Sequence, residues 1–111
     1  MLMRLLLLVL MLFSTSLAGA EEINVPALLG ALKQSVEKAM PGDILRLAPG
    51  EHDGPIIINT PLIIEGDGQA RIRGNDKGSV INVEAPDVVL RGLLITGSGS
   101  KGKDAAINLT V

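Results

Sequence analysis

The chain has 111 residues, of which 47% are hydrophobic and 20% charged, and its formal net charge is −2. It contains no cysteine, which excludes a disulfide-stabilised fold, and its slight acidic excess does not favour a nucleic-acid partner, which a basic patch would attract. The only aromatic residue is Phe13, near the N-terminus, so a core further along must be built from aliphatic side chains.

The first 20 residues have the organisation of a secretory signal peptide. Arg4 precedes an apolar run from Leu5 to Phe13, and a polar stretch follows that ends in Ala18-Gly19-Ala20. The apolar run is too short to span a bilayer. We therefore expect cleavage after Ala20, an exported product, and no membrane attachment after cleavage.

The next segment, residues 21–42, predicts an amphipathic helix over residues 26–40 that caps the fold. Pro26 suits the first helical turn, and Pro41-Gly42 ends the pattern. Apolar residues recur at helical spacing as Leu28, Leu32, Val36 and either Ala39 or Met40. The charged residues expected to face water are Lys33, Glu37 and Lys38.

From Asp43 onward the hydrophobic period changes to two, which is typical of strands. Turn residues such as Pro49-Gly50, Gly66-Asp67-Gly68 and Pro86-Asp87 separate most of the apolar triplets. The triplets are Leu45-Arg46-Leu47, Ile56-Ile57-Ile58, Leu62-Ile63-Ile64, Ala70-Arg71-Ile72, Ile81-Asn82-Val83, Val88-Val89-Leu90, Leu93-Leu94-Ile95 and Ile107-Asn108-Leu109.

These triplets repeat with a period near 25 residues, which indicates a solenoid. The spacings group them into columns: Ile56 with Ile81 and Ile107, Leu62 with Val88, Gly66 with Gly92, and Leu47 with Ile72 and Ile95. The prediction is an all-β parallel β-helix of about three coils over residues 43–111, incomplete and continuing beyond Val111. A parallel α/β sheet is the alternative, but no helical pattern separates the strands as its crossovers require.

Alternation along the strands predicts which side chains point inward and which stack outside. The expected core is Leu45, Leu47, Ile56, Ile58, Leu62, Ile64, Ile72, Ile81, Val83, Val88, Leu90, Leu93 and Ile95. Outside, Ile57, Asn82 and Asn108 should form one column, and Glu65 should lie beside Arg91. An open sheet edge invites pairing with other chains, so the N-terminal helix is expected to cover it.

The stretch "ALKQSVEKAMPGDILRLAPGEHDGPIIINTPLIIEGDG" resembles the start of right-handed β-helix proteins of the pectate-lyase-like group. Its continuation, "PLIIEGDGQARIRGNDKGSVINVEAPDVVLRGLLITGSG", is similar to the NosD family of periplasmic accessory proteins of nitrous oxide reductase. The similarity runs from about Leu28 to Leu109. One departure is His52, where the group usually has an aromatic residue.

This resemblance implies a right-handed β-helix and a periplasmic protein, not an enzyme, that helps to mature the reductase's copper centre. It implies nitrous oxide reductase and an ABC transporter as partners, and copper as the metal concerned. Two other interpretations stay open: a carbohydrate-active enzyme, such as a polysaccharide lyase or uronate epimerase, and a structural or adhesive repeat module.

The residues themselves provide few candidates for chemistry. Copper prefers imidazole or sulfur ligands, and after Ala20 the chain offers only His52 and Met40. We therefore expect His52 to be a turn residue partly packed on the first coil, with no copper site in this segment.

The acidic and basic residues are interpreted as solvated surface charge. The carboxylates Glu51, Asp53, Glu65, Asp67, Asp76, Glu84 and Asp87 are expected in solvated turns and not in a calcium or acid–base site. Arg46 and Arg71 are expected to stack with Arg73 beside them, as a charged outer face in preference to a site for an acidic sugar polymer. The sequence thus assigns no catalytic, cofactor-binding or metal-binding residue.

Overall fold

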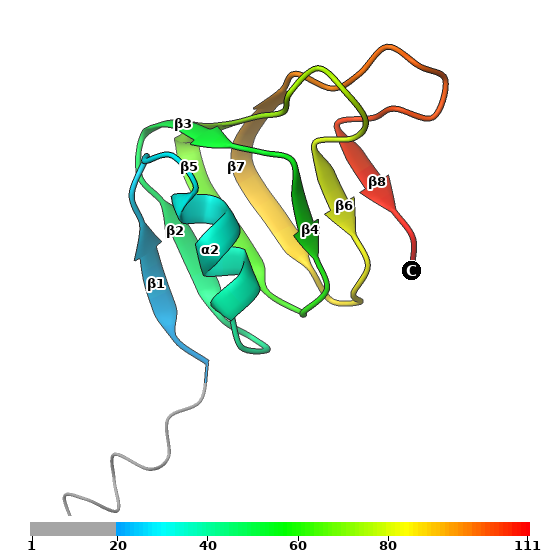
Figure 1. Cartoon of the computed structure of the whole chain (residues 1–111). Coiled ribbons are helices and arrows are strands. Elements are labelled where there is room, and N and C mark those ends of the chain that lie inside the picture. Colours follow the sequence, from blue (N-terminus) through cyan, green and yellow to red (C-terminus); the bar gives the residue numbers. More distant parts are fainter. Residues whose placement is uncertain (1–19) are drawn as a thin grey trace, which may run out of the picture.

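The computed structural model describes residues 20–111, which form a parallel β-solenoid of about four turns with one short helix near its start (Figure 1). The elements in chain order are β1 (Glu22–Val25), α2 (Ala31–Lys38), β2 (Ile44–Leu47), β3 (Gly50–Asp53), β4 (Ile56–Ile58), β5 (Ile63–Arg73), β6 (Ile81–Val83), β7 (Val89–Thr96) and β8 (Ile107–Leu109). The predicted fold class is confirmed.

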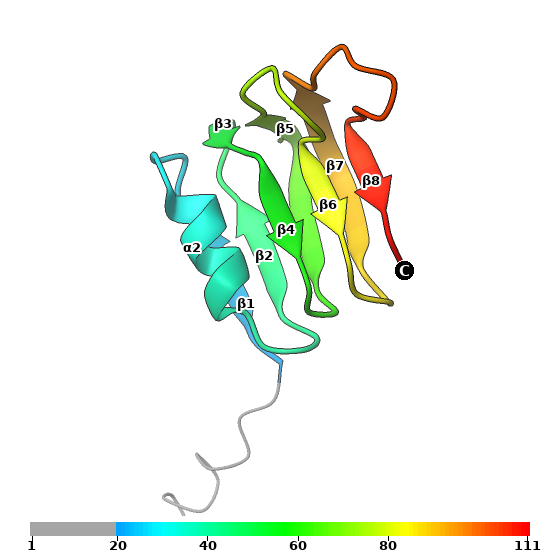
Figure 2. The same ribbon diagram turned by 45° about the vertical axis from the view of Figure 1, so that its right-hand side comes forward.

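The strands form two parallel sheets. In the larger one, which we call sheet A, β1, β2, β5 and β7 lie in this order, and β3 also pairs with β5. In the smaller one, sheet B, the order is β4, β6, β8. Figure 2 shows β4, β6 and β8 side by side, in front of the longer strands. Each turn after the first thus adds one layer to both sheets, and in the first turn the helix stands in place of a strand of sheet B.

The predicted columns are largely confirmed by the strand register. Ile56 pairs with Ile81 and Ile81 with Ile107, and the outward neighbours Ile57, Asn82 and Asn108 stack in the same way. In sheet A, Ile72 pairs with Ile95 and Glu65 with Arg91. Because the apolar side chains repeat once per turn, each lies over its equivalent in the next coil.

One predicted column is wrong. Leu47 pairs with Val25 of β1, whereas Ile72 pairs with His52 of β3. The strands β1 and β3 were not predicted, because "EINV" and "GEHD" lack the repeated aliphatic triplet. With β1 in place, the first coil begins before the helix, so the solenoid has about four turns and not three.

In two cases, a pair of triplets predicted as separate strands forms one continuous strand. The triplets at 62–64 and 70–72 belong to one bent strand, β5, whose register with β7 shifts between Glu65 and Ala70. The bend falls at Gly66-Asp67-Gly68, where Asp67 and Gly68 adopt positive φ values of 54° and 74°. The triplets at 88–90 and 93–95 are likewise joined in β7. A bulge of this kind bends the strand and interrupts its hydrogen-bond ladder only locally.

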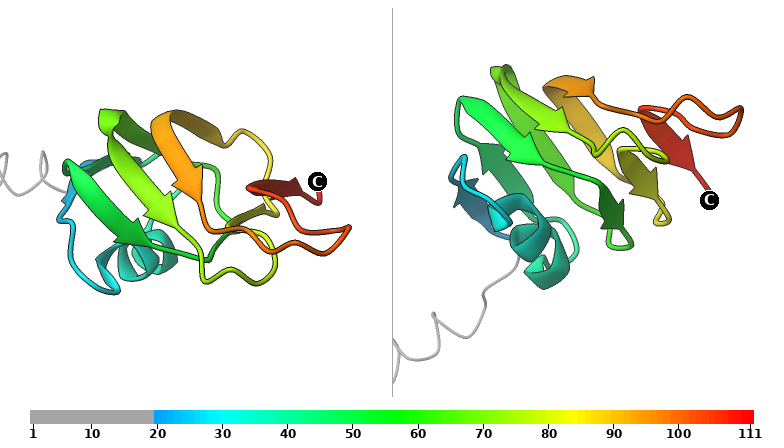
Figure 3. Two further views of the ribbon diagram at one scale, coloured as in Figure 1. Left: turned by 90° about the horizontal axis from the view of Figure 1, so that it is seen from above. Right: turned by 45° about the horizontal axis from the view of Figure 1, so that its top comes forward.

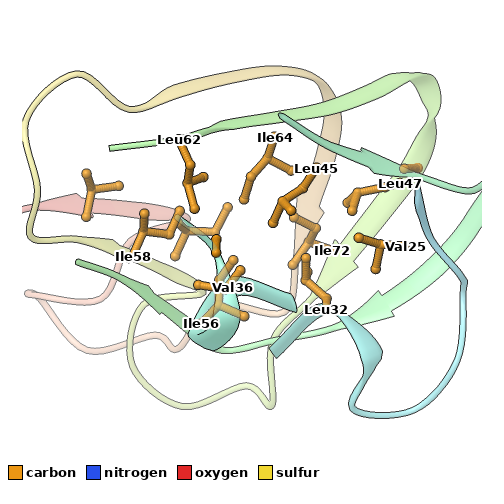
Figure 4. Close-up of a cluster of buried hydrophobic side chains, with 14 of the residues drawn as sticks. Val25, Leu32, Val36, Leu45, Leu47, Ile56, Ile58, Leu62, Ile64 and Ile72 are labelled. Carbon is orange, nitrogen blue, oxygen red and sulfur yellow. The ribbon is translucent and has the colours of Figure 1, made fainter. Parts of the chain in front are cut away.

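The core is aliphatic, as predicted, and lies between the two sheets and the helix. Of the predicted inward residues, the first nine in chain order, Leu45 to Val83, are buried, and Val88, Leu90, Leu93 and Ile95 are partly buried against them. Figure 4 shows Leu32 and Val36 of the helix among the strand residues Ile56 and Ile72. Burial of these side chains is the main favourable contribution to folding.

The helix is shorter than predicted. It spans Ala31–Lys38 and not residues 26–40, because Gly30 at its start has a φ of 77°, outside the range of a right-handed helix. Leu28, predicted on the core-facing side, therefore lies in the preceding loop and is 65% exposed. The core-facing residues Leu32 and Val36 and the exposed residues Lys33, Glu37 and Lys38 are as predicted.

The helix lies at the same end of the solenoid as β1, as the views in Figure 3 show. It contacts β4 and β3 as well as the first two strands, and so covers the end of the core beside sheet B. The predicted signal peptide, residues 1–20, falls outside the described residues except for Ala20. Within residues 20–111, no helix has the length and apolar character needed to cross a membrane.

Candidate functional site

A groove of about 800 Å³ lies between the helix and the outer face of sheet B. One wall is the solvent-facing side of α2, the floor is formed by β4 and β6, and the opposite wall is the loop before β6. The residues that line it are Lys33, Val36, Glu37, Pro55, Ile56, Ile57, Asn59, Lys77, Gly78, Ser79, Asn82 and Glu84.

The lining of this groove combines both signs of charge with an apolar and amide floor. Lys33 and Glu37 come from the helix, Lys77 from the loop, and Glu84 from the end of β6. On the floor, Ile57 is 56% exposed, and the amide of Asn108 donates a 3.3 Å hydrogen bond to the Asn82 Oδ1 beside it. A concave surface with a few convergent polar groups is the usual form of a binding site.

No pattern in the sequence predicts this groove. Lys33 and Glu37 were expected only to face water, and Lys77 was not singled out. Glu84 was expected in a solvated turn, and it is exposed just after β6 at the groove. Nothing in the 25-residue period relates the helix to the loop at 77–79, so only the folded chain brings these residues together.

The predicted stripe of stacked arginines is not formed. Arg46 lies opposite Glu65 and also forms an ion pair with Glu22, whereas Arg71 lies opposite Glu51 in β3. The error follows from the wrong column for Leu47, because the whole strand was assigned to the wrong neighbour. The outer face of sheet A therefore alternates in charge, which supports stacking of the coils more than binding of a polyanion.

The predicted neighbours Glu65 and Arg91 form an ion pair. The main-chain N–H of Asp67 donates a 3.0 Å hydrogen bond to Glu65, and this bond is the main cause that lowers the pKa of the Glu65 carboxyl, ahead of the contact with Arg91. The carboxylate is thus held in its charged form by the bend in β5 and by the next coil. A second pair joins Arg73 Nη1 to Glu51 Oε1 at 3.6 Å.

His52 is more deeply buried than predicted. It is 1% exposed within β3, and its inward column continues through Ile72 and Ile95. Its Nε2 lies 2.8 Å from the carbonyl oxygen of Ala48 and therefore donates, whereas its Nδ1 is buried without a partner in the described part of the chain. The side chain serves mainly as a ring that fills space at a corner of the second coil.

Replacement of His52 separates a packing role from a ligand role. His52→Ala should lower the free energy of unfolding by roughly 3 kcal/mol because it leaves a cavity. His52→Phe keeps a ring and removes the unpaired Nδ1, so it should cost only about 1 kcal/mol for the lost hydrogen bond. Urea unfolding of both variants measures this difference; equal losses would show that the bond to Ala48, and not the ring, is what the core needs.

Two acidic residues hold the N-terminal end of the fold together. Asp53, predicted in a solvated turn, accepts a 3.3 Å hydrogen bond through Oδ2 from the N–H of Gly30, at the start of the helix. Asp43, which the sequence did not single out, is 3% exposed and accepts hydrogen bonds from the N–H groups of Glu21 and Met40, each at 2.8 Å. Both carboxylates satisfy main-chain donors that would otherwise lack partners.

Of the other acids predicted in turns, Asp76 and Asp87 lie in turns as expected, whereas Asp67 lies at the bend inside β5, and Glu51 and Glu65 lie in the strands β3 and β5. Asp67, Asp76 and Asp87 are exposed and have positive φ values, a backbone conformation that aspartate tolerates better than most residues. Within residues 20–111, no three histidine, cysteine or acidic side chains lie close enough together to hold a metal ion. His52, whose Nε2 is engaged by Ala48, and Met40, on the exposed loop after the helix, do not fit a copper site.

Comparison of the chain with protein-family models, with curated proteins and with solved structures finds no match. The structure therefore classifies the chain by its architecture, as a parallel β-solenoid.

Proposed function

We propose that the protein is an exported, periplasmic accessory protein similar to NosD, which uses its β-solenoid as a binding scaffold during maturation of the copper centre of nitrous oxide reductase. The observation that carries this proposal is the groove between α2 and sheet B, whose lining has charges of both signs and an apolar floor. Such a lining suits a protein surface, because exposed charges select the partner and apolar contacts add affinity.

The sequence supports the proposal through its resemblance to the NosD family and through its N-terminal signal-like segment. The proposal assigns no copper ligand to residues 20–111, where His52 and Met40 do not form a site. Nitrous oxide reductase is the partner expected to bind in the groove. An ABC transporter is expected to act alongside the two proteins. In this role the segment binds and positions a partner and carries out no reaction.

The proposal predicts that charge reversal in the groove stops copper insertion into nitrous oxide reductase. In a denitrifying host that lacks its own copy, the unaltered gene should restore the copper content of the reductase. The pair Lys33→Glu and Lys77→Glu should fail to restore it, because both walls of the groove then repel an acidic contact surface. Copper per purified reductase, by elemental analysis, is the measurement.

The matched control reverses two lysines that do not line the groove, Lys101→Glu and Lys103→Glu, in an exposed loop. This variant carries the same change in net charge and should restore copper fully. A reductase that is fully metallated in the complete absence of the protein would rule out the accessory role.

A carbohydrate-active enzyme is the second candidate, and one observation favours it. Glu37 and Glu84 share the groove with Lys33 and Lys77, so carboxylates and amines converge on one hollow surface. Lyases and epimerases need an acid and a base on the same substrate. Turnover of polygalacturonate or alginate that is lost in Glu84→Gln would favour this candidate over the accessory protein.

A further inference from the structure

A carboxylate is buried at the N-terminal end of the fold, and the residues that the structure describes provide it with no cationic partner. Asp43 is 3% exposed, and its Oδ1 and Oδ2 accept hydrogen bonds from the N–H groups of Glu21 and Met40. Within residues 20–111, the three ion pairs involve Glu22, Glu51 and Glu65 and not Asp43. A buried charge is costly unless it is paired, and a bond between two ions is stronger than a bond from a neutral amide.

The nitrogen of Glu21 and the carboxylate of Asp43 are both held in place by the main chain. The carbonyl of Glu21 accepts a 2.8 Å hydrogen bond from the N–H of Ile44, so Glu21 already belongs to the ladder between β1 and β2. Asp43 is anchored on both sides, since its N–H donates to Met40 at 3.1 Å and its carbonyl accepts from Ile63 at 2.9 Å. The 2.8 Å contact between the Glu21 nitrogen and Asp43 Oδ1 is thus fixed before any change in charge.

We propose that cleavage of the peptide bond between Ala20 and Glu21 completes this site, because the new α-ammonium group of Glu21 forms an ion pair with Asp43. Hydrolysis by a signal peptidase adds one water molecule, which leaves a carboxylate on Ala20 and an amine on Glu21. The amine takes up a proton near neutral pH, since the pKa of an α-amino group is about 8. The natural cleavage step rests on the proposed function, because it requires that the protein is exported. The ion pair itself requires only that the chain begins at Glu21.

The site depends on the position of the cleavage to within one residue. A chain that begins at Ala20 keeps a neutral amide at Glu21, and its ammonium group lies one residue, about 3.8 Å along the chain, farther from Asp43. A chain that begins at Glu22 removes the donor to Asp43 Oδ1 altogether. Ala20 is exposed and precedes the first strand, so the bond to be cut lies at the margin of the folded part.

The test compares three chains that end at Val111 and begin at Ala20, Glu21 or Glu22. Each is produced with a removable N-terminal tag, and removal of the tag in vitro leaves the intended first residue. Urea unfolding measures their stability. The chain that begins at Glu21 should be the most stable, because its bond to Asp43 is ionic. The chain that begins at Ala20 has a neutral bond at this place, so its equilibrium constant for unfolding should be about fivefold larger. The Glu22 chain should be the least stable.

Asp43→Asn provides the control, because it keeps the size of the side chain and removes its charge. In this variant the difference between the Glu21 and Ala20 chains should disappear. If the variant does not fold, acetylation of the Glu21 α-amine in the unaltered chain replaces it, and this should raise the unfolding constant by the same factor. Equal stability of the free and acetylated chains would overturn the ion pair, as would a difference that persists in Asp43→Asn.

Failure of this inference can be told apart from failure of the proposed function, because the unfolding measurements need neither export nor copper. The intact mass of the protein recovered from the periplasm of a bacterial host reports the natural cleavage position. A first residue of Glu21 is expected. A different first residue would overturn the processing step and leave the role of the groove to be judged by the copper content of the reductase.

Discussion

Leu32→Asp is expected to detach the helix and cause the solenoid to self-associate. Leu32 is 1% exposed and belongs to the core cluster, so an aspartate there would bury an unpaired charge at a cost of about 4 kcal/mol or more. That loss is comparable to the whole stability of a small domain. With the helix released, the end of the core beside β4 is open to other chains. Sedimentation and circular dichroism measure the association and the loss of helix.

Gln34→Asp is the matched control, because it introduces the same side chain on the exposed face of the same helix. It should remain monomeric and melt close to the unaltered protein. Leu32→Asp tests the role of the helix more specifically than a deletion of residues 21–40, because that deletion would also remove β1. A Leu32→Asp variant that stays monomeric, with unchanged melting, would show that the helix is not a cap.

Gly66→Ala is expected to have the second large effect, because two coils approach most closely there. A Cβ on Gly66 would lie 2.4 Å from the carbonyl oxygen of Gly92 and 2.6 Å from a side-chain carbon of Leu93. The carbonyl belongs to the next coil and cannot turn aside without a change in the stacking of β5 and β7. We expect a loss of roughly 3 kcal/mol, at the upper end of overpacking costs, and a melting temperature lower by about 15 °C.

Gly102→Ala is the control for this prediction, since a Cβ there meets nothing within 4 Å and the residue has no left-handed φ. It should leave the melting temperature nearly unchanged or raise it slightly, because alanine restricts the unfolded chain. Thermal unfolding followed by circular dichroism compares the two variants. Similar melting of both would mean that the coils can separate at Gly66 at little cost.

The period of the sequence determined the class of the fold and most of its layers. Ile56, Ile81 and Ile107 recur once per turn and stack as expected, because a solenoid uses the same inward position in every coil. Alternation along each strand likewise identified the buried residues, since side chains of a strand point to opposite faces in turn. These properties are local or strictly repeated, so they can be read from one sequence.

Tertiary structure alone decided the first two coils, where the repeat is interrupted. Glu22–Val25 and Gly50–Asp53 become strands because neighbouring strands offer them hydrogen-bond partners, although their own sequences lack the aliphatic pattern. Without them, Leu47 and Arg46 were placed in the wrong column. Similarly, the spacing of Leu28 suggested a longer helix, whereas the left-handed Gly30, held by Asp53, fixes the actual start.

The candidate sites were also decided by tertiary structure, for the same physical reason. Lys33 and Lys77, which no multiple of the repeat relates, line one groove, and the Glu21 nitrogen lies 2.8 Å from Asp43 Oδ1 because β1, a strand that the sequence did not predict, pairs with β2. Contacts of this kind depend on the path of the chain around the corners and on how the helix lies over the first coil. The repeat determines which strands stack, whereas the non-repeating residues meet only once the chain has folded.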